Sequence, residues 1–125
     1  MGKEPHLKLT IRLCGEAEQR CFGPGMATLL ERVREHRSLR AAAASMDMAY
    51  SKAWRILRTA EAALGYPLLR STTGGPHGGG AVLTPEAERL LTFYRQYTAE
   101  VEAFAQERFT RTFPQLPEWE DTETP

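Results

Sequence analysis

Apolar residues alternate with polar ones near the start of the chain. From Leu7 to Leu13 every second position is leucine or isoleucine, and a period of two marks a strand with one buried face. A turn is expected at Gly15, after which Gln19 to Phe22 returns as a second strand. The pattern therefore predicts a β-hairpin over residues 7–22. Two roles stay open for it: packing against a helical core, or pairing its edge with another chain.

The apolar period then changes to that of helices. In residues 26–36 the apolar positions fall three and four apart, which predicts a helix with one buried stripe. Ser38 precedes an alanine-rich segment, and serine is a preferred N-cap. A turn over residues 46–49 follows, in which Asp47 is expected to be left-handed, because aspartate tolerates that conformation better than most residues. Residues 38–64 are thus predicted to form a helix-turn-helix.

The second helix of this pair, from Tyr50 to Leu64, has two distinct faces. Its apolar face contains Ala53, Trp54, Leu57, Ala60 and Leu64. Its opposite face contains Ser51, Lys52, Arg55, Arg58 and Thr59. Arginine can form two hydrogen bonds with the acceptor edge of guanine, and lysine or serine can bond phosphates or bases. This face suits the DNA major groove, and a solvated helix face is the alternative. Trp54 is expected in the core.

Glycines then predict a hairpin loop. Gly65 is expected to end the helix in a left-handed conformation, and Pro67 prevents its continuation. Residues 66–83 are predicted to form a two-stranded wing around a loop with five glycines between residues 74 and 80. The loop is not a nucleotide-binding P-loop, because Gly-Lys-Ser/Thr does not follow it. It is expected to lie along a DNA backbone; a hairpin tip without a ligand is the alternative.

A long last helix is predicted over residues 85–111. Thr84 is a suitable N-cap and Pro85 suits the first helical position. Six apolar positions step by three and four, as in a coiled-coil seam. They are Ala87, Leu90, Tyr94, Tyr97, Val101 and Phe104. We expect them to form a dimer interface; a helix that covers its own domain is the alternative.

Charge is unevenly distributed along a chain whose net charge is zero. Between Arg34 and Arg58 six basic residues outnumber two acidic ones, a net charge of +4. From Glu100 to the end, seven acidic residues outnumber two basic ones, a net charge of −5. The first segment therefore suits nucleic acid. Residues 1–112 are expected to form a single domain, and residues 113–125 an acidic, flexible tail.

Other chemistry finds little support in the sequence. No apolar run is long enough to span a membrane, and the N-terminus lacks the apolar core of a signal peptide, so a cytoplasmic location is expected. Cys14 and Cys21 are expected to be free thiols, with a redox bridge across the hairpin as the alternative. The three histidines fall in unrelated segments and no residues show catalytic spacing. We therefore expect no enzyme activity, no metal and no cofactor.

Several motifs together resemble one family. They are Tyr50-Ser51-Lys52-Ala53-Trp54 in the second helix, Thr73-Gly74-Gly75 and Gly78-Gly79-Gly80-Ala81 in the loop, and Leu83-Thr84-Pro85 before the last helix. From about Leu7 to Phe109 the chain resembles the N-terminal DNA-binding domain of ModE, the molybdate-responsive transcription regulator, and related stand-alone proteins. More distantly, Glu61, Leu64-Gly65 and Pro67-Leu68 resemble the LysR-type helix-turn-helix.

The resemblance implies an α+β, mainly α fold: a winged helix-turn-helix with an N-terminal β-hairpin, a two-stranded wing and a long C-terminal dimerisation helix. It implies a homodimer that binds double-stranded operator DNA. The predicted DNA-binding residues are Ser38, Tyr50, Ser51, Lys52, Arg55, Arg58, Thr72, Thr73, Gly74, Gly75, His77 and Gly78.

Three departures from the family's pattern bear on this interpretation. Ala49 stands where the family usually has a serine, which removes a helix cap worth about 1 kcal/mol. Pro76-His77 stands where the wing usually carries a lysine, which makes the wing less positive. The sequence stops after the long helix, so we expect no molybdate-binding domain and infer no direct molybdate sensing.

Two functions follow as expectations. The first is a dimeric, sequence-specific transcription regulator. The second is a protein-interaction module on the same fold with weak or no DNA binding, which the zero net charge and the altered wing favour. A separate sensor or protein partner fits either one. The operator, the regulated genes, the direction of regulation and the signal do not follow from the sequence.

Overall fold

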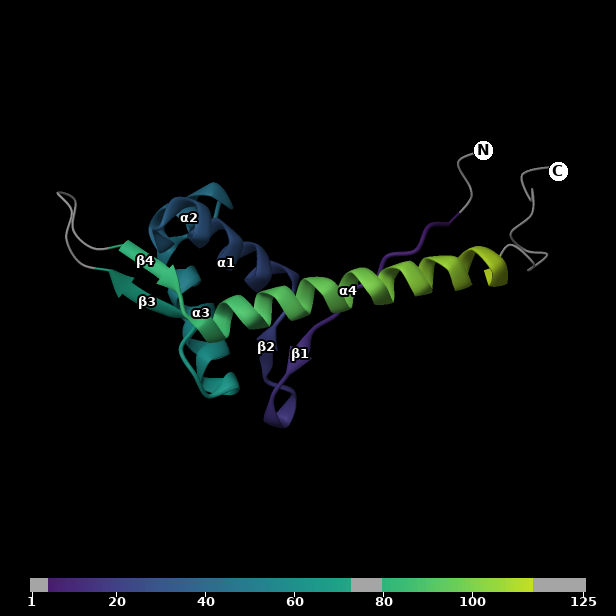
Figure 1. Cartoon of the computed structure of the whole chain (residues 1–125), viewed down its shortest axis with the longest axis horizontal. Coiled ribbons are helices and arrows are strands. Elements are labelled where there is room, and N and C mark those ends of the chain that lie inside the picture. Colours follow the sequence, from purple (N-terminus) through teal and green to yellow (C-terminus); the bar gives the residue numbers. More distant parts are fainter. Residues whose placement is uncertain (1–4, 73–79, 114–125) are drawn as a thin grey trace. The chain divides into compact units, whose positions relative to one another are not determined.

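The computed structural model describes residues 5–72 and 80–113 of the 125-residue chain. Figure 1 shows the arrangement of its helices and strands. In chain order they are β1 (Leu13–Cys14), the 3₁₀-helix η1 (Glu16–Glu18), β2 (Arg20–Phe22), α1 (Pro24–His36), α2 (Leu39–Ser45), α3 (Tyr50–Leu64), β3 (Leu69–Thr72), β4 (Gly80–Leu83) and α4 (Pro85–Thr112). Mostly helical, with two separate two-stranded antiparallel sheets, this architecture confirms the predicted winged helix-turn-helix class.

Contacts between Cα atoms divide the chain into two compact units. Residues 10–95 form the larger unit, which we call the winged-helix unit, and it contains everything from β1 to the first part of α4. The second unit contains the described residues 5–9 and 96–113. The predicted division into a domain over residues 1–112 and a tail over residues 113–125 stays a prediction, and residues 114–125 lie outside the described part.

Helix α1 lies at the centre of the winged-helix unit. Its side chains Leu29, Leu30 and Val33 have no exposed surface. Helix α2 packs on α1 through Ala42 and Ala43, which are also fully buried. Because alanine adds little bulk beyond the backbone, the two helices can approach closely. The alanine-rich segment is therefore a packing surface of the helix-turn-helix.

The N-terminal hairpin is shorter than its alternating pattern predicts. Strands β1 and β2 pair Leu13 with Phe22 and, across a bulge, Cys14 with Arg20. Residues 7–12 form no strand, because the returning chain enters α1 at Pro24 and offers these residues no strand to pair with. One freed carbonyl, that of Ile11, instead accepts a 2.7 Å hydrogen bond from the Tyr94 hydroxyl.

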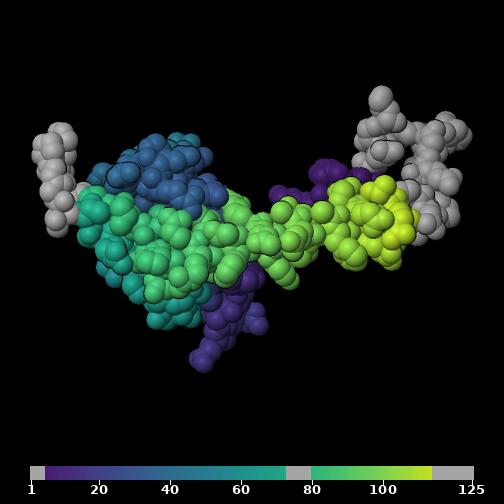
Figure 2. All heavy atoms as spheres, viewed as in Figure 1, coloured from purple at the N-terminus to yellow at the C-terminus, as the bar shows by residue number. Residues whose placement is uncertain are grey.

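The hairpin nevertheless packs on the helical core, as one of the two expected roles requires. The Phe22 ring is buried and lies 5.0 Å from the Tyr94 ring in an edge-to-face arrangement. Figure 2 shows the turn of this hairpin, in purple, projecting from the rest of the winged-helix unit. Cys14 is exposed and Cys21 is buried, and both are free thiols, as expected.

Short polar contacts connect the wing to the start of α4. Strands β3 and β4 pair in continuous register from Leu69 opposite Leu83 to Thr72 opposite Gly80. The Thr84 hydroxyl donates to the Pro67 carbonyl (2.9 Å) and accepts from the Ala87 N–H (3.1 Å). This second bond confirms Thr84 as the N-cap of α4. In the described residues, no helix is both long and apolar enough to cross a membrane.

Candidate nucleic-acid interface

The turn between α2 and α3 is built largely from local hydrogen bonds. The N–H groups of Met46 and Met48 both bond to the Ala43 carbonyl at 2.9 Å. Asp47 lies between them with φ 55°, which confirms the predicted left-handed residue. Both methionines are half-buried against the core. These bonds fix the angle at which α3 leaves α2.

The two helices of the helix-turn-helix begin differently. At α2 the Ser38 hydroxyl oxygen accepts a 3.0 Å hydrogen bond from the Ala41 N–H, which confirms the predicted cap. At α3 the N-cap is Ala49, which makes no side-chain bond. The first turn of α3 therefore lacks the stabilisation that a serine or threonine would supply. The predicted contact of Ser38 with DNA stays a prediction.

Helix α3 has the two faces that its sequence predicts, with two differences. Ala53, Leu57 and Ala60 are buried, while the exposed residues include Ser51, Lys52, Arg55 and Arg58. Trp54 was expected in the core, and Thr59 on the outer face; both are half-buried instead. Lys52 and Arg55 pair with no carboxylate among the described residues.

Two arginines lie over two aromatic rings beside α3. The guanidinium carbon of Arg40 lies 4.0 Å from the centre of the Tyr50 ring, and that of Arg58 lies 4.5 Å from a ring centre of Trp54. The two rings meet edge to face at 6.3 Å. Cation–π contacts of this kind hold a guanidinium in place while leaving its N–H edge free to donate.

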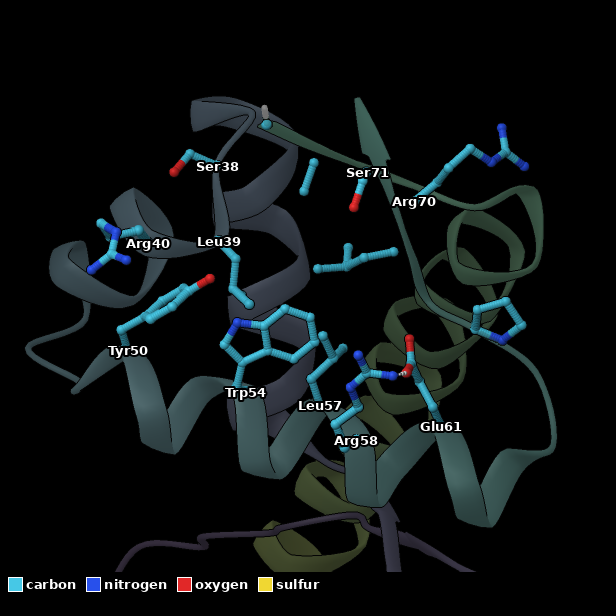
Figure 3. A pocket seen from close by; sticks show the side chains of 14 residues that line it. Ser38, Leu39, Arg40, Tyr50, Trp54, Leu57, Arg58, Glu61, Arg70 and Ser71 are labelled. Carbon is cyan, nitrogen blue, oxygen red and sulfur yellow. Dashed lines mark ion pairs between the residues drawn. The ribbon is translucent and has the colours of Figure 1, made fainter. Parts of the chain in front are cut away.

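These residues form one wall of a pocket between α3 and the wing. The pocket has a volume of about 560 Å³, and its lining comes from the start of α2, one side of α3, and strands β3 and β4. Figure 3 shows Trp54 between Tyr50 and Arg58, with the Ser71 hydroxyl turned toward the interior and the Arg70 side chain turned outward. We call this pocket the α3–wing groove. Neither this groove nor the contribution of Arg40 and Ser71 to its lining was predicted from the sequence.

Glu61 closes one end of the groove. One of its carboxylate oxygens accepts a 2.8 Å hydrogen bond from the Leu68 N–H, at the entry to the wing. The other lies 3.9 Å from an Arg58 nitrogen. The residue thus connects the loop before β3 to a basic side chain of α3.

The base of the wing rests on the loop between α1 and α2. The Ala81 N–H donates a 3.1 Å hydrogen bond to the Arg37 carbonyl, and Arg37 itself is left-handed with φ 58°. A Cβ atom at Gly80 would lie 2.5 Å from that carbonyl oxygen. Glycine is therefore required at position 80 by a close backbone approach.

The predicted wing contacts fall mostly outside the described residues. Thr72 is half-buried, and its hydroxyl accepts a 3.0 Å hydrogen bond from the Gly80 N–H. Thr73, Gly74, Gly75, His77 and Gly78 lie in the segment that the structure does not describe. Their contacts with DNA stay predictions.

Half of the predicted dimer seam belongs to the core of the winged-helix unit. Ala87 and Tyr94 are buried there, and Leu90 packs against the same core while half-exposed. Ala87 and Tyr94 have little surface left for an interface between chains, because it is covered within this chain. The dimer interface itself stays a prediction. In the second unit, Tyr97 and Phe104 are 57% and 68% exposed, and Val101 is half-buried. Phe93, which was not predicted, is 63% exposed.

The described residues contain no group of three or more histidine, cysteine, aspartate or glutamate side chains suited to hold a metal ion. Besides the Arg58–Glu61 contact within α3, ion pairs connect α1 with α4. Arg95 donates to both carboxylate oxygens of Glu31, at 3.0 and 2.8 Å, and Arg34 donates to Glu88. Hydrogen bonding from Arg95 lowers the pKa of the Glu31 carboxyl below its usual value.

Comparison with known proteins gives a consistent result for this region. Residues 26–88 match the family described as bacterial regulatory helix-turn-helix protein, lysR family. The chain is 37% identical over 93 residues to the transcriptional regulator ModE of Haemophilus influenzae, covering 74% of this chain and 35% of that protein.

Two further relatives match over shorter lengths, 90 and 80 residues. The molybdenum transport protein ModE of Herbaspirillum seropedicae is 32% identical over 90 residues, which cover 72% of this chain and 32% of that protein. The molybdenum-pterin-binding protein MopB of Rhodobacter capsulatus is 34% identical over 80 residues, which cover 64% of this chain and 30% of that protein. The chain thus spans about a third of the length of the curated relatives it matches.

Proposed function

Since the chain belongs to the lysR family of bacterial regulatory helix-turn-helix proteins and its winged helix-turn-helix is ModE-like, we propose that it binds operator DNA sequence-specifically as a homodimer and so regulates transcription. One observation carries the proposal: α3 exposes Ser51, Lys52 and Arg55 on one face, beside a two-stranded wing. A helix presented in this way enters the major groove in helix-turn-helix proteins, where its side chains reach base edges.

The local charge supports this orientation. The segment from Arg34 to Arg58 has a net charge of +4 within a neutral chain. Lys52 and Arg55 extend from the exposed face of α3 without a carboxylate partner in the described part of the chain. DNA phosphates would therefore not compete with an internal ion pair for these two side chains.

Exposed aromatic residues of α4 support the homodimer. Tyr97 and Phe104 are seven residues apart in one helix, the interval between equivalent positions of a coiled-coil seam. Each exposes more than half of its surface. A second copy of the same helix offers matching rings, and two recognition helices would then meet half-sites about one DNA turn apart.

The first test is selection of bound sequences from random DNA duplexes by the purified chain. Recovery of an inverted repeat with a fixed half-site spacing is the expected result. The absence of any preferred sequence would contradict sequence-specific binding and favour the protein-interaction module, which the zero net charge of the chain also allows.

The second test assigns the contact face. Replacing both Lys52 and Arg55 with alanine should weaken binding to the selected duplex and make affinity less dependent on salt, since fewer counterions are released. Arg89→Ala, which removes an exposed arginine of α4, is the control and should bind as the unmodified chain does. Unchanged affinity and salt dependence in the double variant would exclude these two residues from the interface.

A further inference from the structure

The α3–wing groove lies where a DNA strand has to pass if the proposed function is correct. The major and minor grooves of a duplex are separated by a phosphodiester backbone. If α3 enters the major groove and the wing lies along the neighbouring backbone or minor groove, one strand crosses the space between α3 and the β3–β4 hairpin. That space is the α3–wing groove, whose lining comes from both elements.

The groove has the chemistry of a phosphate site. Arg40 and Arg58 line one side, and Ser71 from β3 turns its hydroxyl toward the interior. Glu61 is the one acidic residue among the lining side chains. One of its oxygens accepts the Leu68 N–H, and the other lies 3.9 Å from an Arg58 nitrogen, beyond hydrogen-bond distance. Arginine N–H groups and a serine hydroxyl are donors that bind phosphate oxygens.

The aromatic rings keep the two guanidinium groups in place before any ligand arrives. Arg40 lies 4.0 Å from the centre of the Tyr50 ring and Arg58 lies 4.5 Å from that of Trp54. A guanidinium stacked on a ring retains its in-plane N–H donors. Less side-chain freedom is then lost when a phosphate binds.

Helical spacing separates this stripe from the predicted base-contacting residues. Tyr50, Trp54 and Arg58 recur every four residues along α3 and line the groove together (Figure 3). Lys52 and Arg55 do not line it. Arg58 therefore faces the wing side of the helix.

We propose that the α3–wing groove seats a backbone phosphate of the bound DNA strand, held by Arg40 and Arg58. This inference rests on the proposed DNA binding and divides the predicted contact residues into two classes. Arg58, together with the previously unpredicted Arg40, positions the duplex without regard to sequence. Ser51, Lys52 and Arg55 are left to read the bases.

The test compares four variants on two duplexes, the selected site and an unrelated sequence, across a range of salt concentrations. Arg40→Gln and Arg58→Gln each remove one charge from the groove. Arg55→Gln changes a predicted base contact, and Arg20→Gln removes an exposed arginine of β2 outside the groove. All four side chains are exposed, so the variants are expected to fold, and circular dichroism checks this.

The expected pattern is specific to each class. Arg40→Gln and Arg58→Gln should each weaken binding about tenfold on both duplexes alike, as expected for one charged hydrogen bond. Each should also reduce the slope of log affinity against log salt by about 0.9. Arg55→Gln should instead lower the ratio between the two affinities, and Arg20→Gln should change neither quantity.

A neutral methylphosphonate placed at single positions of the duplex identifies the phosphate itself. When the methylphosphonate replaces the phosphate that the groove holds, Arg58→Gln should lower the affinity little further, because the phosphate charge that Arg58 would contact is already absent. Equal effects of Arg58→Gln on every modified duplex would overturn the assignment. So would loss of sequence preference in Arg58→Gln, or an unchanged salt slope in both groove variants.

Two outcomes separate this inference from its premise. If the unmodified chain binds neither duplex, the proposed function fails and the inference fails with it. The other outcome is that the unmodified chain binds DNA normally and also binds inorganic phosphate, as measured by calorimetry. If Arg40→Gln then abolishes phosphate binding but leaves the salt dependence of DNA binding unchanged, the groove is a site for a free anion. That result would overturn the inference alone.

Discussion

Single residues at the ends of helices determine much of the helix-turn-helix. Arg37 after α1 and Asp47 after α2 are both left-handed, with φ 58° and 55°. That conformation costs a non-glycine residue roughly 1–2 kcal/mol, and aspartate tolerates it better than arginine. At Arg37 the left-handed conformation occurs together with a long-range hydrogen bond, in which the Arg37 carbonyl accepts the Ala81 N–H of the wing.

Restoring the missing cap of α3 should stabilise the protein. Ala49 is the N-cap and makes no side-chain bond, so in Ala49→Ser a new oxygen can accept an amide of the first turn. We expect the free energy of unfolding to rise by about 1 kcal/mol, measured by urea denaturation. Ala62→Ser, at an exposed position within α3, is the control and should be slightly destabilising. Equal effects of the two changes would argue against the cap.

Adding a methyl group at Gly80 should weaken the wing. A Cβ there would lie 2.5 Å from the Arg37 carbonyl oxygen, which forces backbone movement because neither atom belongs to a flexible side chain. Gly80→Ala should lower the free energy of unfolding by about 1–3 kcal/mol. Gly25→Ala, in the first turn of α1 with no atom within 4 Å of the added Cβ, should be neutral or stabilising. Thermal unfolding of both variants tests this difference in stability. An unchanged melting temperature for Gly80→Ala would contradict the prediction.

At the scale of helices and strands, a feature could be predicted from the sequence when residues close to it in the chain determine it. The caps at Ser38 and Thr84 and the left-handed Asp47 follow from nearby residues, and the structure confirms them. Alternation between Leu7 and Leu13 predicted too long a strand, because a strand also needs a partner, and Pro24 ends the one available.

Non-local arrangements were beyond the reach of periodicity. Apolar spacing in α4 cannot distinguish a surface covered by the chain's own core from one covered by a second chain, and Ala87 and Tyr94 are covered by the chain's own core. The α3–wing groove combines Arg40, Trp54 and Ser71 from three separate segments. The exposed basic residues around Trp54 were the only available signal.

The ion pair between Glu31 of α1 and Arg95 of α4 should make the free energy of unfolding depend on pH. Hydrogen bonding from Arg95 lowers the pKa of Glu31 in the folded chain below its ordinary value. The contribution of this ion pair to stability is therefore fully present above the unfolded-state pKa of Glu31, and it is lost as the pH falls through the folded-state pKa. Both side chains are more than a third exposed, so the contribution is at most about 1 kcal/mol.

Glu31→Gln tests this contribution through denaturation at pH 7 and at pH 3. The variant should be slightly less stable than the unmodified chain at pH 7, and the difference should shrink toward pH 3, as the Glu31 carboxylate of the unmodified chain takes up its proton. Glu35→Gln, at an exposed position of the same helix, should show no such convergence. A constant difference at both pH values would mean that the pair does not titrate as described.

At the scale of the whole molecule, affinity for DNA depends on how many copies bind together. A neutral chain with one basic segment gains less from long-range attraction than a uniformly basic one. Joining two copies makes the second half-site contact intramolecular. The exposed Tyr97 and Phe104 rings of α4 are the described residues that best fit such an assembly.

Phe104→Asp should therefore produce a monomer. It places a charge on the proposed interface, and the side chain is already 68% exposed, so folding is not expected to suffer. Sedimentation should show half the mass, and affinity for a two-half-site operator should fall roughly a hundredfold or more. Binding to an isolated half-site should change little. Ala99→Asp, at an exposed α4 position about half a turn away from the Tyr97–Phe104 stripe, should remain dimeric; a dimeric Phe104→Asp would remove Phe104 from the interface.

The bond between Ala81 and Arg37 also has a consequence for the order of folding. The two residues are 44 positions apart in the sequence, and contacts between distant residues form only after the loop between them has closed. The wing can bind the Arg37 carbonyl only after the intervening segment, which contains α2 and α3, has folded back toward the end of α1. Amide hydrogen exchange at Ala81 should then be slow only in chains whose helices are assembled, and it should report when the wing side of the α3–wing groove opens.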